Sequence, residues 1–502
     1  QIKVVEVRAG KGGLTVSALG IAPTPLGVVQ NNIITDPKVM GQTIRQLMKQ
    51  SGVSAKRVVG SVAGQSAVVV RIIEVPKMTD AELKETMKWE VERHVPFAPS
   101  ETVLDYQPLQ PRDSSNPNNP NMEVLLAVAQ QDVISNYLDT AFAAGLDPVA
   151  IDIEPLAVAR ALLDIAEGRA VVRPQGLDLE AQASMGIYPE TVAIVNIGAS
   201  NTDISVFQGD QLTFPRSLPL AGDSLTRAIA EALGQTLEQS EHLKREHGSI
   251  QLERMAIYTG TAYGGQEFQE NALTFDEDDT GFVSGLPDDD AAASPFDFSD
   301  TEDLGGFQRS PSQRLGEAQF DDAERTQPMS RRTLNLARPV HPDNPLPFMP
   351  PTDGDAGLGL PTFGGEEDNA ALRDQVFEAI APVLGELATE LRRSLDYYRS
   401  RAQGQSVDRV LLTGGSASLG NLAPFLQNEL QVPVSVANPL ATLSVTSKHY
   451  DPAYLPTIAP AFAIALGLAA RDAVFDANPV PKKPKTAPVA PPAPAAPAAS
   501  AS

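Results

Sequence analysis

The chain opens with short β-branched runs that alternate with stretches of helical periodicity. Residues 1–7 alternate apolar and polar positions, and residues 14–19 follow a glycine turn, so together they predict a hairpin. Residues 37–50 repeat apolar side chains at helical spacing. Residues 57–62 and 67–75 predict two more strands. This order of strands and helices indicates an α/β fold.

A second hairpin is predicted at residues 191–207, TVAIVNIGASNTDISVF. Two β-branched strands, 191–196 and 202–207, flank a turn made of Gly198, Ala199, Ser200 and Asn201. The turn has little side-chain bulk, so its backbone amides can close on an anion such as phosphate. An ordinary hairpin that needs Gly and Asn for its turn geometry is the alternative.

Residues 76–145 have the pattern of a small α/β insert. Thr79 and Glu82 form a T-x-x-E capping box, and apolar residues then recur at every fourth position. The one tryptophan, Trp89, lies off that apolar line. We interpret it as a second packing contact of the helix, with an anchor for a partner protein as the alternative.

The second half of the chain contains several predicted helices. Gly222 and Asp223 open one, and residues 236–246 form another that carries Glu241 and Lys244 among other charges. The ordinary interpretation of such a charged run is a solvated face. Residues 370–401 are strongly amphipathic, with Pro382 predicted to kink the helix.

The last ordered part of the chain combines a strand, a glycine turn and helices. Residues 407–412 predict a strand that runs into TGGSA at 413–417, which contains Gly414, Gly415 and Ser416. Residues 456–470 are rich in Ala and Gly and predict one closely packed helix.

Composition excludes several classes of protein. The 502 residues are enough for two or more domains, and the net charge of -24 argues against sequence-independent nucleic-acid binding. Cysteine is absent and the five histidines have no metal-ligand spacing. No apolar run reaches the length of a membrane span and no signal peptide is recognisable, which predicts a cytoplasmic location.

Two segments predict disorder. Residues 261–330 contain 17 Asp and Glu against 3 Arg, and the following forty residues are rich in Pro and Gly. Such a segment cannot bury enough apolar surface to offset the entropy of ordering it. The Pro- and Ala-rich composition of the end of the chain predicts an extended tail.

A strand–glycine turn–strand unit followed much later by strand, TGGSA and helix resembles the plan of the actin-like ATPases. Four segments closely resemble the PilM family of type IV pilus assembly. They are VPKMTDAELKETMKWEVERHVPF (75–97), AGLDPVAIDIEPLAVARAL (144–162), NIGASNTDISVF (196–207) and RVLLTGGSASLGNLAPFL (409–426). The resemblance covers nearly all of 1–250 and 370–472.

The resemblance implies an α/β, actin-like two-lobed ATPase fold with a small α/β insert subdomain, a disordered acidic insertion and a disordered Pro/Ala-rich tail. Lobe 1 would comprise 1–75 and 148–185, around the insert at 76–147. Lobe 2 would comprise 186–260 and 370–472, the latter including the return helix. The acidic insertion would occupy 261–369 and the tail 473–502.

The same resemblance implies a nucleotide site between the lobes, holding ATP and Mg²⁺. The second phosphate loop would run from Asn196 through the Gly198–Asn201 turn to Thr202, with its amides on the β- and γ-phosphates. Gly222 and Asp223 would close on the nucleotide. The remaining implied contacts are with adenosine, from Glu241, Lys244, Gly414, Gly415 and Ser416. Glu154 matches the position that orients the attacking water, with a carboxylate favourable to its helix dipole as the alternative.

Two departures from the family pattern argue against ATP hydrolysis. Relatives carry a D-x-G-type first phosphate loop just before the residues matching 2–7, so this loop is expected upstream of Gln1 or is absent. Relatives also have Asp where this chain has Asn196, the candidate metal-facing residue. An amide keeps the oxygen but loses the charge that attracts Mg²⁺ and its water. ATP binding is expected of the full-length form.

Three functions follow from these observations. The first is a PilM-type scaffold that binds ATP and, in a groove between insert and first lobe, the cytoplasmic N-terminal peptide of the inner-membrane protein PilN. The second is an active ATPase switch of the same machine. The third is an FtsA-like membrane-tethered filament protein, which the lack of an amphipathic helix in the tail disfavours. Other pilus platform proteins and a second copy are further expected partners, with the membrane reached only through partners.

Overall fold

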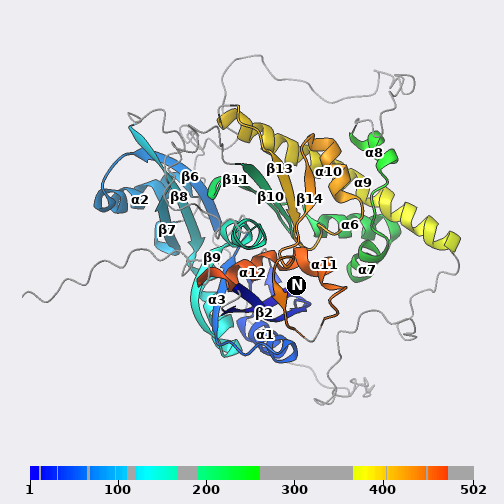
Figure 1. The fold of residues 1–502 in the computed structure, drawn as a ribbon, viewed down its shortest axis with the longest axis horizontal. Helices are drawn as coiled ribbons and strands as arrows, with labels where there is room; N and C mark the ends of the chain where they lie inside the picture. The colour runs from blue at the N-terminus through cyan, green and yellow to red at the C-terminus, as the bar shows by residue number, and fades with distance from the viewer. Residues whose placement is uncertain are drawn as a thin grey trace, which may run out of the picture. The chain divides into compact units, whose positions relative to one another are not determined.

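The computed structural model describes residues 1–10, 13–30, 32–64, 68–95, 98–109, 120–167, 190–259, 366–402, 404–447 and 450–472. Figure 1 shows the arrangement of their helices and strands. The predicted disorder of the acidic insertion up to residue 365, and that of the tail, falls outside the described residues. Helix α9 begins at Glu366, inside the stretch predicted to be disordered.

The first lobe is built on a hairpin of β1 (Ile2–Gly10) and β2 (Gly13–Ala22), as the alternating pattern predicted. Strand β15 (Ser444–Val445) joins β2 in parallel. Beside this sheet lie β3 (Val29–Gln30) paired with β4 (Ile33–Ile34), and β5 (Arg57–Val62) paired in parallel with β9 (Asp147–Ile153). Helices α1 (Pro37–Ser51) and α3 (Gln131–Ala144) pack against each other.

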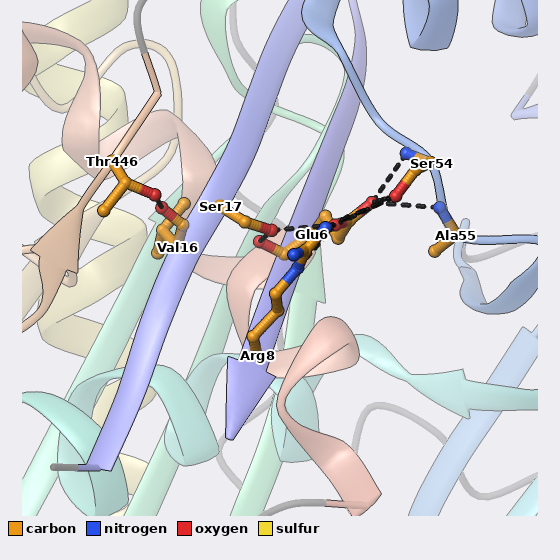
Figure 2. Close-up of polar contacts among 7 residues, drawn as sticks. All are labelled: Glu6, Arg8, Val16, Ser17, Ser54, Ala55 and Thr446. Carbon is orange, nitrogen blue, oxygen red and sulfur yellow. Dashed lines mark hydrogen bonds and ion pairs between the residues drawn. The ribbon is translucent and has the colours of Figure 1, made fainter. Parts of the chain in front are cut away.

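A buried carboxylate fastens β1 to the chain that leaves α1. The side chain of Glu6 is 7% exposed and accepts hydrogen bonds from the backbone amides of Ser54, at 2.6 Å, and Ala55, at 2.9 Å. Figure 2 shows that Arg8 and Ser17 donate to the same carboxylate, at 2.9 Å and 2.8 Å. The four groups lie on three separate segments of the first lobe, so Glu6 holds these segments together.

A separate three-stranded sheet, in the order β6-β8-β7, forms the insert region. It contains β6 (Val68–Pro76), β7 (Thr102–Pro108) and β8 (Asn121–Gln130), with α2 (Asp80–His94) and the short 3₁₀ helix η1 (Pro99–Glu101). The predicted capping box of Thr79 and Glu82 is present. Because the line of Leu83, Met87 and Val91 already covers the sheet, Trp89 is left 68% exposed. Its interpretation as a packing contact is wrong.

The second lobe is a five-stranded sheet in the order β12-β11-β10-β13-β14. Its strands are β10 (Thr191–Ile197), β11 (Thr202–Gln208), β12 (Gln211–Leu218), β13 (Arg409–Thr413) and β14 (Val434–Val436). Its helices are α6 (Gly222–Leu233), α7 (Leu237–His247), α8 (Leu252–Thr259), α9 (Glu366–Arg401) and α10 (Leu422–Leu430). Buried side chains of α9 and α10 share a core with β10 and β13, and α9 continues past Pro382.

Two further helical segments pack closely together. The first is α4 (Glu154–Ala159) with the π-helix η2 (Arg160–Ala166). The second is α11 (Leu455–Ile458), the 3₁₀ helix η3 (Ala459–Phe462) and α12 (Ala463–Ala469). The prediction of one continuous helix at 456–470 is wrong, because prolines such as Pro460 lack the N–H that an α-helix interior needs. A Cβ on Gly467 would lie 1.7 Å from the carbonyl oxygen of Ala157, so this contact requires glycine.

Candidate functional site

The turn between β10 and β11 exposes a row of unused backbone donors. The amide of Gly198 donates to the carbonyl of Asn201 at 3.0 Å, which closes the turn. Within the described part of the chain, the amides of Ala199, Ser200 and Asn201 donate to no protein acceptor. Three successive amides without a protein acceptor at the end of a strand are available to a ligand with acceptor oxygens, such as phosphate.

The start of α6 is fastened to this turn. The amides of Gly222 and Asp223 donate to the carbonyls of Gly198, at 3.1 Å, and Ala199, at 2.7 Å. The hydroxyl of Ser200 donates to the carboxylate of Asp223 at 3.1 Å. Two of the predicted nucleotide-binding segments are therefore adjacent, although the Gly222 and Asp223 amides are used within the protein.

The TGGSA segment meets the same turn from the neighbouring strand, β13. The amide of Ser416 donates to the carbonyl of Ile197 at 3.2 Å. Gly414 has φ +94°, and a Cβ there would lie 2.4 Å from the Ile197 oxygen and 2.7 Å from Oδ1 of Asn196. A Cβ on Gly415 would have open space around it. The backbone thus passes close to Asn196 only because position 414 is glycine.

Helix α7 adds an ion pair to these segments. Nζ of Lys244 lies 2.6 Å from Oε2 of Glu241 and donates to the Gly222 carbonyl at 2.9 Å and to the Thr226 hydroxyl at 2.8 Å. Lys244 is only 8% exposed, so the interpretation of this helix as a wholly solvated charged face is wrong. Burial acts to raise the pKa of Glu241, but contacts with Lys244 and Thr226 outweigh it and lower that pKa.

We call these four segments the loop cluster. It consists of the turn 198–202, the pair Gly222 and Asp223, residues 414–416, and the pair Glu241 and Lys244. The structure therefore brings together the residues that the sequence predicted for a nucleotide.

Glu154 stands beside Asn196 at the start of α4. It lines a small cavity together with Pro155, Val158, Ile194, Asn196, Asp203 and Ser205. Burial, and then the charge of Asp203, raise the pKa of Glu154 to about 8, although the Ser61 hydroxyl and Lys3 act to lower it. A favourable helix dipole alone would lower the pKa of Glu154, so the rise shows that burial and Asp203 outweigh the dipole.

Three residues of this cavity region were missed in the sequence. Asp203 lies opposite Asn196 in the β10–β11 register, and burial raises the pKa of Asp203 despite hydrogen bonds to Asn196 and Ser217. Burial lowers the pKa of Lys3, which interacts with Glu154. Ser61 donates to Glu154 at 3.4 Å. The available signal was Asp203, the one charged residue of β11, whereas Lys3 lies in β1 among other charged residues and gave no such signal.

The residues present fit ATP better than they fit a protein-held metal. The three free amides suit phosphate oxygens, and Asn196, Asp203 and Glu154 offer oxygen ligands of the type that Mg²⁺ prefers. Across the described ranges, however, no cluster of three or more His, Asp or Glu side chains has a metal-binding arrangement. Mg²⁺ would therefore need the oxygens of phosphate and water in addition to Asn196.

Replacing Glu154 with glutamine is expected to stabilise the protein increasingly as the pH rises. The folded protein keeps a proton on Glu154 up to about pH 8, whereas the unfolded chain loses it near pH 4.5, so wild-type stability falls between these values. A shift of this size corresponds to at most about 5 kcal/mol. Because Glu154 is only partly buried, we expect a gain of about 1–3 kcal/mol at pH 8.

Urea unfolding of Glu154→Gln and wild type between pH 5 and pH 9 measures this gain. Glu85→Gln, on the exposed side of α2, is the control and should show no widening difference with pH. A Glu154→Gln difference that stays constant over this range would show that the carboxyl of Glu154 titrates normally.

The two lobes, their sheets and the loop cluster define an actin-like fold. The family model of type IV pilus assembly protein PilM matches residues 1–250 and 370–473. The chain belongs to this PilM family, which confirms the resemblance found in the sequence, and the predicted fold class is confirmed with it.

Comparison with solved structures and curated proteins gives three further similarities. The structure is similar to that of the PilM-PilN type IV pilus biogenesis complex, with 25% sequence identity, a TM-score of 0.59, and coverage of 93% of this chain and 94% of that one. Cell division protein FtsA of Bacillus subtilis is 28% identical over 127 residues, which span 25% of this chain and 24% of FtsA. MreB5 of Spiroplasma citri bound to ADP is more distant, at 12% identity and a TM-score of 0.35, covering 95% of this chain and 98% of that one.

Proposed function

We propose that this protein is a scaffold of the inner-membrane complex that assembles type IV pili, and that it binds ATP in the loop cluster. The observation that carries the ATP proposal is the row of three free amides at Ala199, Ser200 and Asn201. They would receive the phosphates, while residues 414–416 with Glu241 and Lys244 would lie against adenosine. Membership of the PilM family supports the role in pilus assembly.

The chemistry of Glu154 favours binding over hydrolysis. A general base must be ionised to accept a proton from water, and a carboxyl with a pKa of about 8 is mostly protonated at neutral pH. Asn196 also lacks the charge of a metal-binding carboxylate. An ATPase switch of the same machine remains the second candidate, because Asp203 places one more carboxylate on the cavity.

The proposed membrane partner is the N-terminal cytoplasmic peptide of PilN. The supporting observation is the 25% identity to a protein solved as a PilM-PilN complex. The peptide would lie between the insert sheet β6-β8-β7 and the first lobe and would bring the protein to the inner membrane. Other platform proteins and a second copy of this chain are further proposed partners. No helix in the described part of the chain is long and apolar enough to cross a bilayer.

The deciding experiment is calorimetric titration of the full chain with ATP and Mg²⁺, together with an assay of phosphate release. We expect ATP binding without turnover, and tighter Mg²⁺-dependent binding by Asn196→Asp, because the new carboxylate attracts the cation. Asn136→Asp on α3 is the matched control and should leave ATP affinity unchanged. Absence of ATP binding alongside binding of the PilN peptide would leave a nucleotide-free scaffold, and phosphate release would support the ATPase switch.

A further inference from the structure

Helix α1 presents a basic surface in an otherwise acidic protein. The helix contains Lys38, Arg45 and Lys49 and no Asp or Glu, although the chain carries a net charge of -24. The three basic residues are seven and four positions apart, so they follow one side of the helix, and all three are exposed. Lys56, also exposed, lies between the C-cap of α1 at Gly52 and the start of β5. We call these four residues the α1 surface.

Exposed apolar side chains border the α1 surface. Leu26 is 99% exposed at a turn closed by a hydrogen bond from the Val28 amide to the Pro25 carbonyl. The turn is held beside the start of α1, because the Thr35 hydroxyl donates to the Gly27 carbonyl at 3.0 Å. Phe142, 58% exposed, belongs to helix α3. Helices α3 and α1 lie side by side (Figure 1).

Helices α1 and α3 are in direct contact, so the charged and apolar groups are close neighbours. A Cβ on Gly41 would lie 2.6 Å from Cβ of Ala143, which follows Phe142. Arg45 donates to the carbonyl of Ala143 at 2.6 Å and to that of Ala144 at 3.2 Å. The basic stripe of α1 therefore runs beside the end of α3.

We propose that the α1 surface binds the anionic headgroup layer of a phospholipid membrane, with Leu26 inserted between headgroups. The basic residues of α1 span Lys38 to Lys49, about 17 Å along the helix, which suits a broad negative plane. Leu26 is almost fully exposed, so no neighbouring side chains form the wall of a peptide pocket around it. A single leucine at a turn tip is suited to insertion at the level of the headgroups.

The overall negative charge is compatible with this surface. The 17 acidic residues of 261–330 enter the sequence after α8, whereas the α1 surface belongs to the first lobe. At physiological ionic strength, charges are screened beyond about 8 Å, so charges close to the α1 surface weigh more in its contact with a membrane than the net charge of the whole chain does. The contact is direct and would act in addition to a membrane protein partner.

Flotation of the full chain with vesicles tests the proposal. Vesicles of phosphatidylcholine alone are compared with vesicles that contain about 30% phosphatidylglycerol, each at about 50 and about 300 mM salt. Binding through opposite charges requires the anionic lipid and weakens at the higher salt concentration, whereas other adsorption does neither. We expect binding to the anionic vesicles only, weakened by salt. Lys38→Gln/Lys49→Gln/Lys56→Gln should reduce binding at least about tenfold, since each basic residue near an anionic membrane contributes about a fivefold gain. Leu26→Ser should reduce binding to the anionic vesicles at both salt concentrations.

The matched control is Lys84→Gln/Lys88→Gln/Arg93→Gln, which removes three exposed basic residues from α2. Equal loss of vesicle binding in both triple variants would overturn the proposal, since net charge alone would then explain binding. Failure of the wild-type chain to float with anionic vesicles at 50 mM salt would also overturn it. Binding of poly-glutamate without vesicle binding would assign the surface to an acidic peptide instead. Melting temperatures of all variants should equal that of wild type, because every changed residue is exposed.

Discussion

Gly414→Ala is expected to abolish ATP binding to the loop cluster and to lower the free energy of unfolding by about 2–4 kcal/mol. Gly414 has φ +94°, a conformation that costs an alanine energy even in open space. The new Cβ would also lie 2.4 Å from the Ile197 carbonyl oxygen and 2.7 Å from Oδ1 of Asn196. The first atom belongs to the backbone of β10 and the second to a side chain that is only 7% exposed, so neither can move away at little cost. The displaced β10 end carries the turn proposed to hold phosphate.

Gly234→Ala is the matched control for this substitution. Gly234 also has a positive φ, +63°, but a Cβ there meets no atom within 4 Å. It should therefore lose only the conformational part of the stability, about 1 kcal/mol, and keep its ATP affinity. Calorimetric ATP titration and urea unfolding of both variants separate the two effects. Retention of wild-type ATP affinity by Gly414→Ala would remove residues 414–416 from the nucleotide site.

Local signals allowed much of the candidate site to be predicted from the sequence. The turn Gly198–Asn201 has no bulky side chain, and its flanking β-branched runs fix it between two strands. TGGSA follows another strand directly, so parallel pairing of β13 with β10 brings both glycine segments to the same sheet end. Neighbouring residues in the sequence were enough to locate the two glycine turns, and the resemblance to the PilM family supplied their expected role in binding a nucleotide.

The charged cavity beyond them could not be predicted in this way. Lys3, Glu154 and Asp203 lie on β1, α4 and β11, and only the packing of two lobes brings them together. Their unusual protonation arises from burial, which depends on that packing and not on spacing along the chain. Lys244 illustrates the same limit. The sequence predicted a solvated face for its charged helix, whereas in the structure α6 packs against that helix and Lys244 donates to Thr226.

Trp89 shows why the exposed surface was also hard to predict. A helix of the insert packs through one line of apolar residues, and the sequence does not say whether a large residue beside that line is covered by another element. In the structure the line of Leu83, Met87 and Val91 faces the sheet and Trp89 does not. The alternative interpretation, an anchor for a partner, therefore stays a prediction.

Glu6→Gln is expected to lower the free energy of unfolding by about 2–4 kcal/mol at pH 7. Burial acts to raise the pKa of Glu6, but hydrogen bonds from the Ser54 and Ala55 amides, Arg8 and Ser17 outweigh it and lower the pKa to about 2. Glutamine has nearly the same volume but loses the charge, and its NH₂ group faces donors where the carboxylate offered an acceptor (Figure 2). The change leaves at least one donor that faces the buried Glu6 position without a good partner.

The pH dependence identifies the charge as the cause. The folded pKa of about 2 lies below the unfolded value of 4.5, so the stability that Glu6 contributes is complete above pH 4.5 and is lost as the pH falls toward 2. The difference between wild type and Glu6→Gln in urea unfolding should therefore be constant from pH 7 to pH 5 and shrink below it. Glu85→Gln, which changes an exposed carboxylate paired with Lys88, should differ little from wild type throughout. A Glu6→Gln deficit that persists unchanged at pH 3 would mean that side-chain shape, and not the ionised carboxylate, joins β1 to the loop after α1.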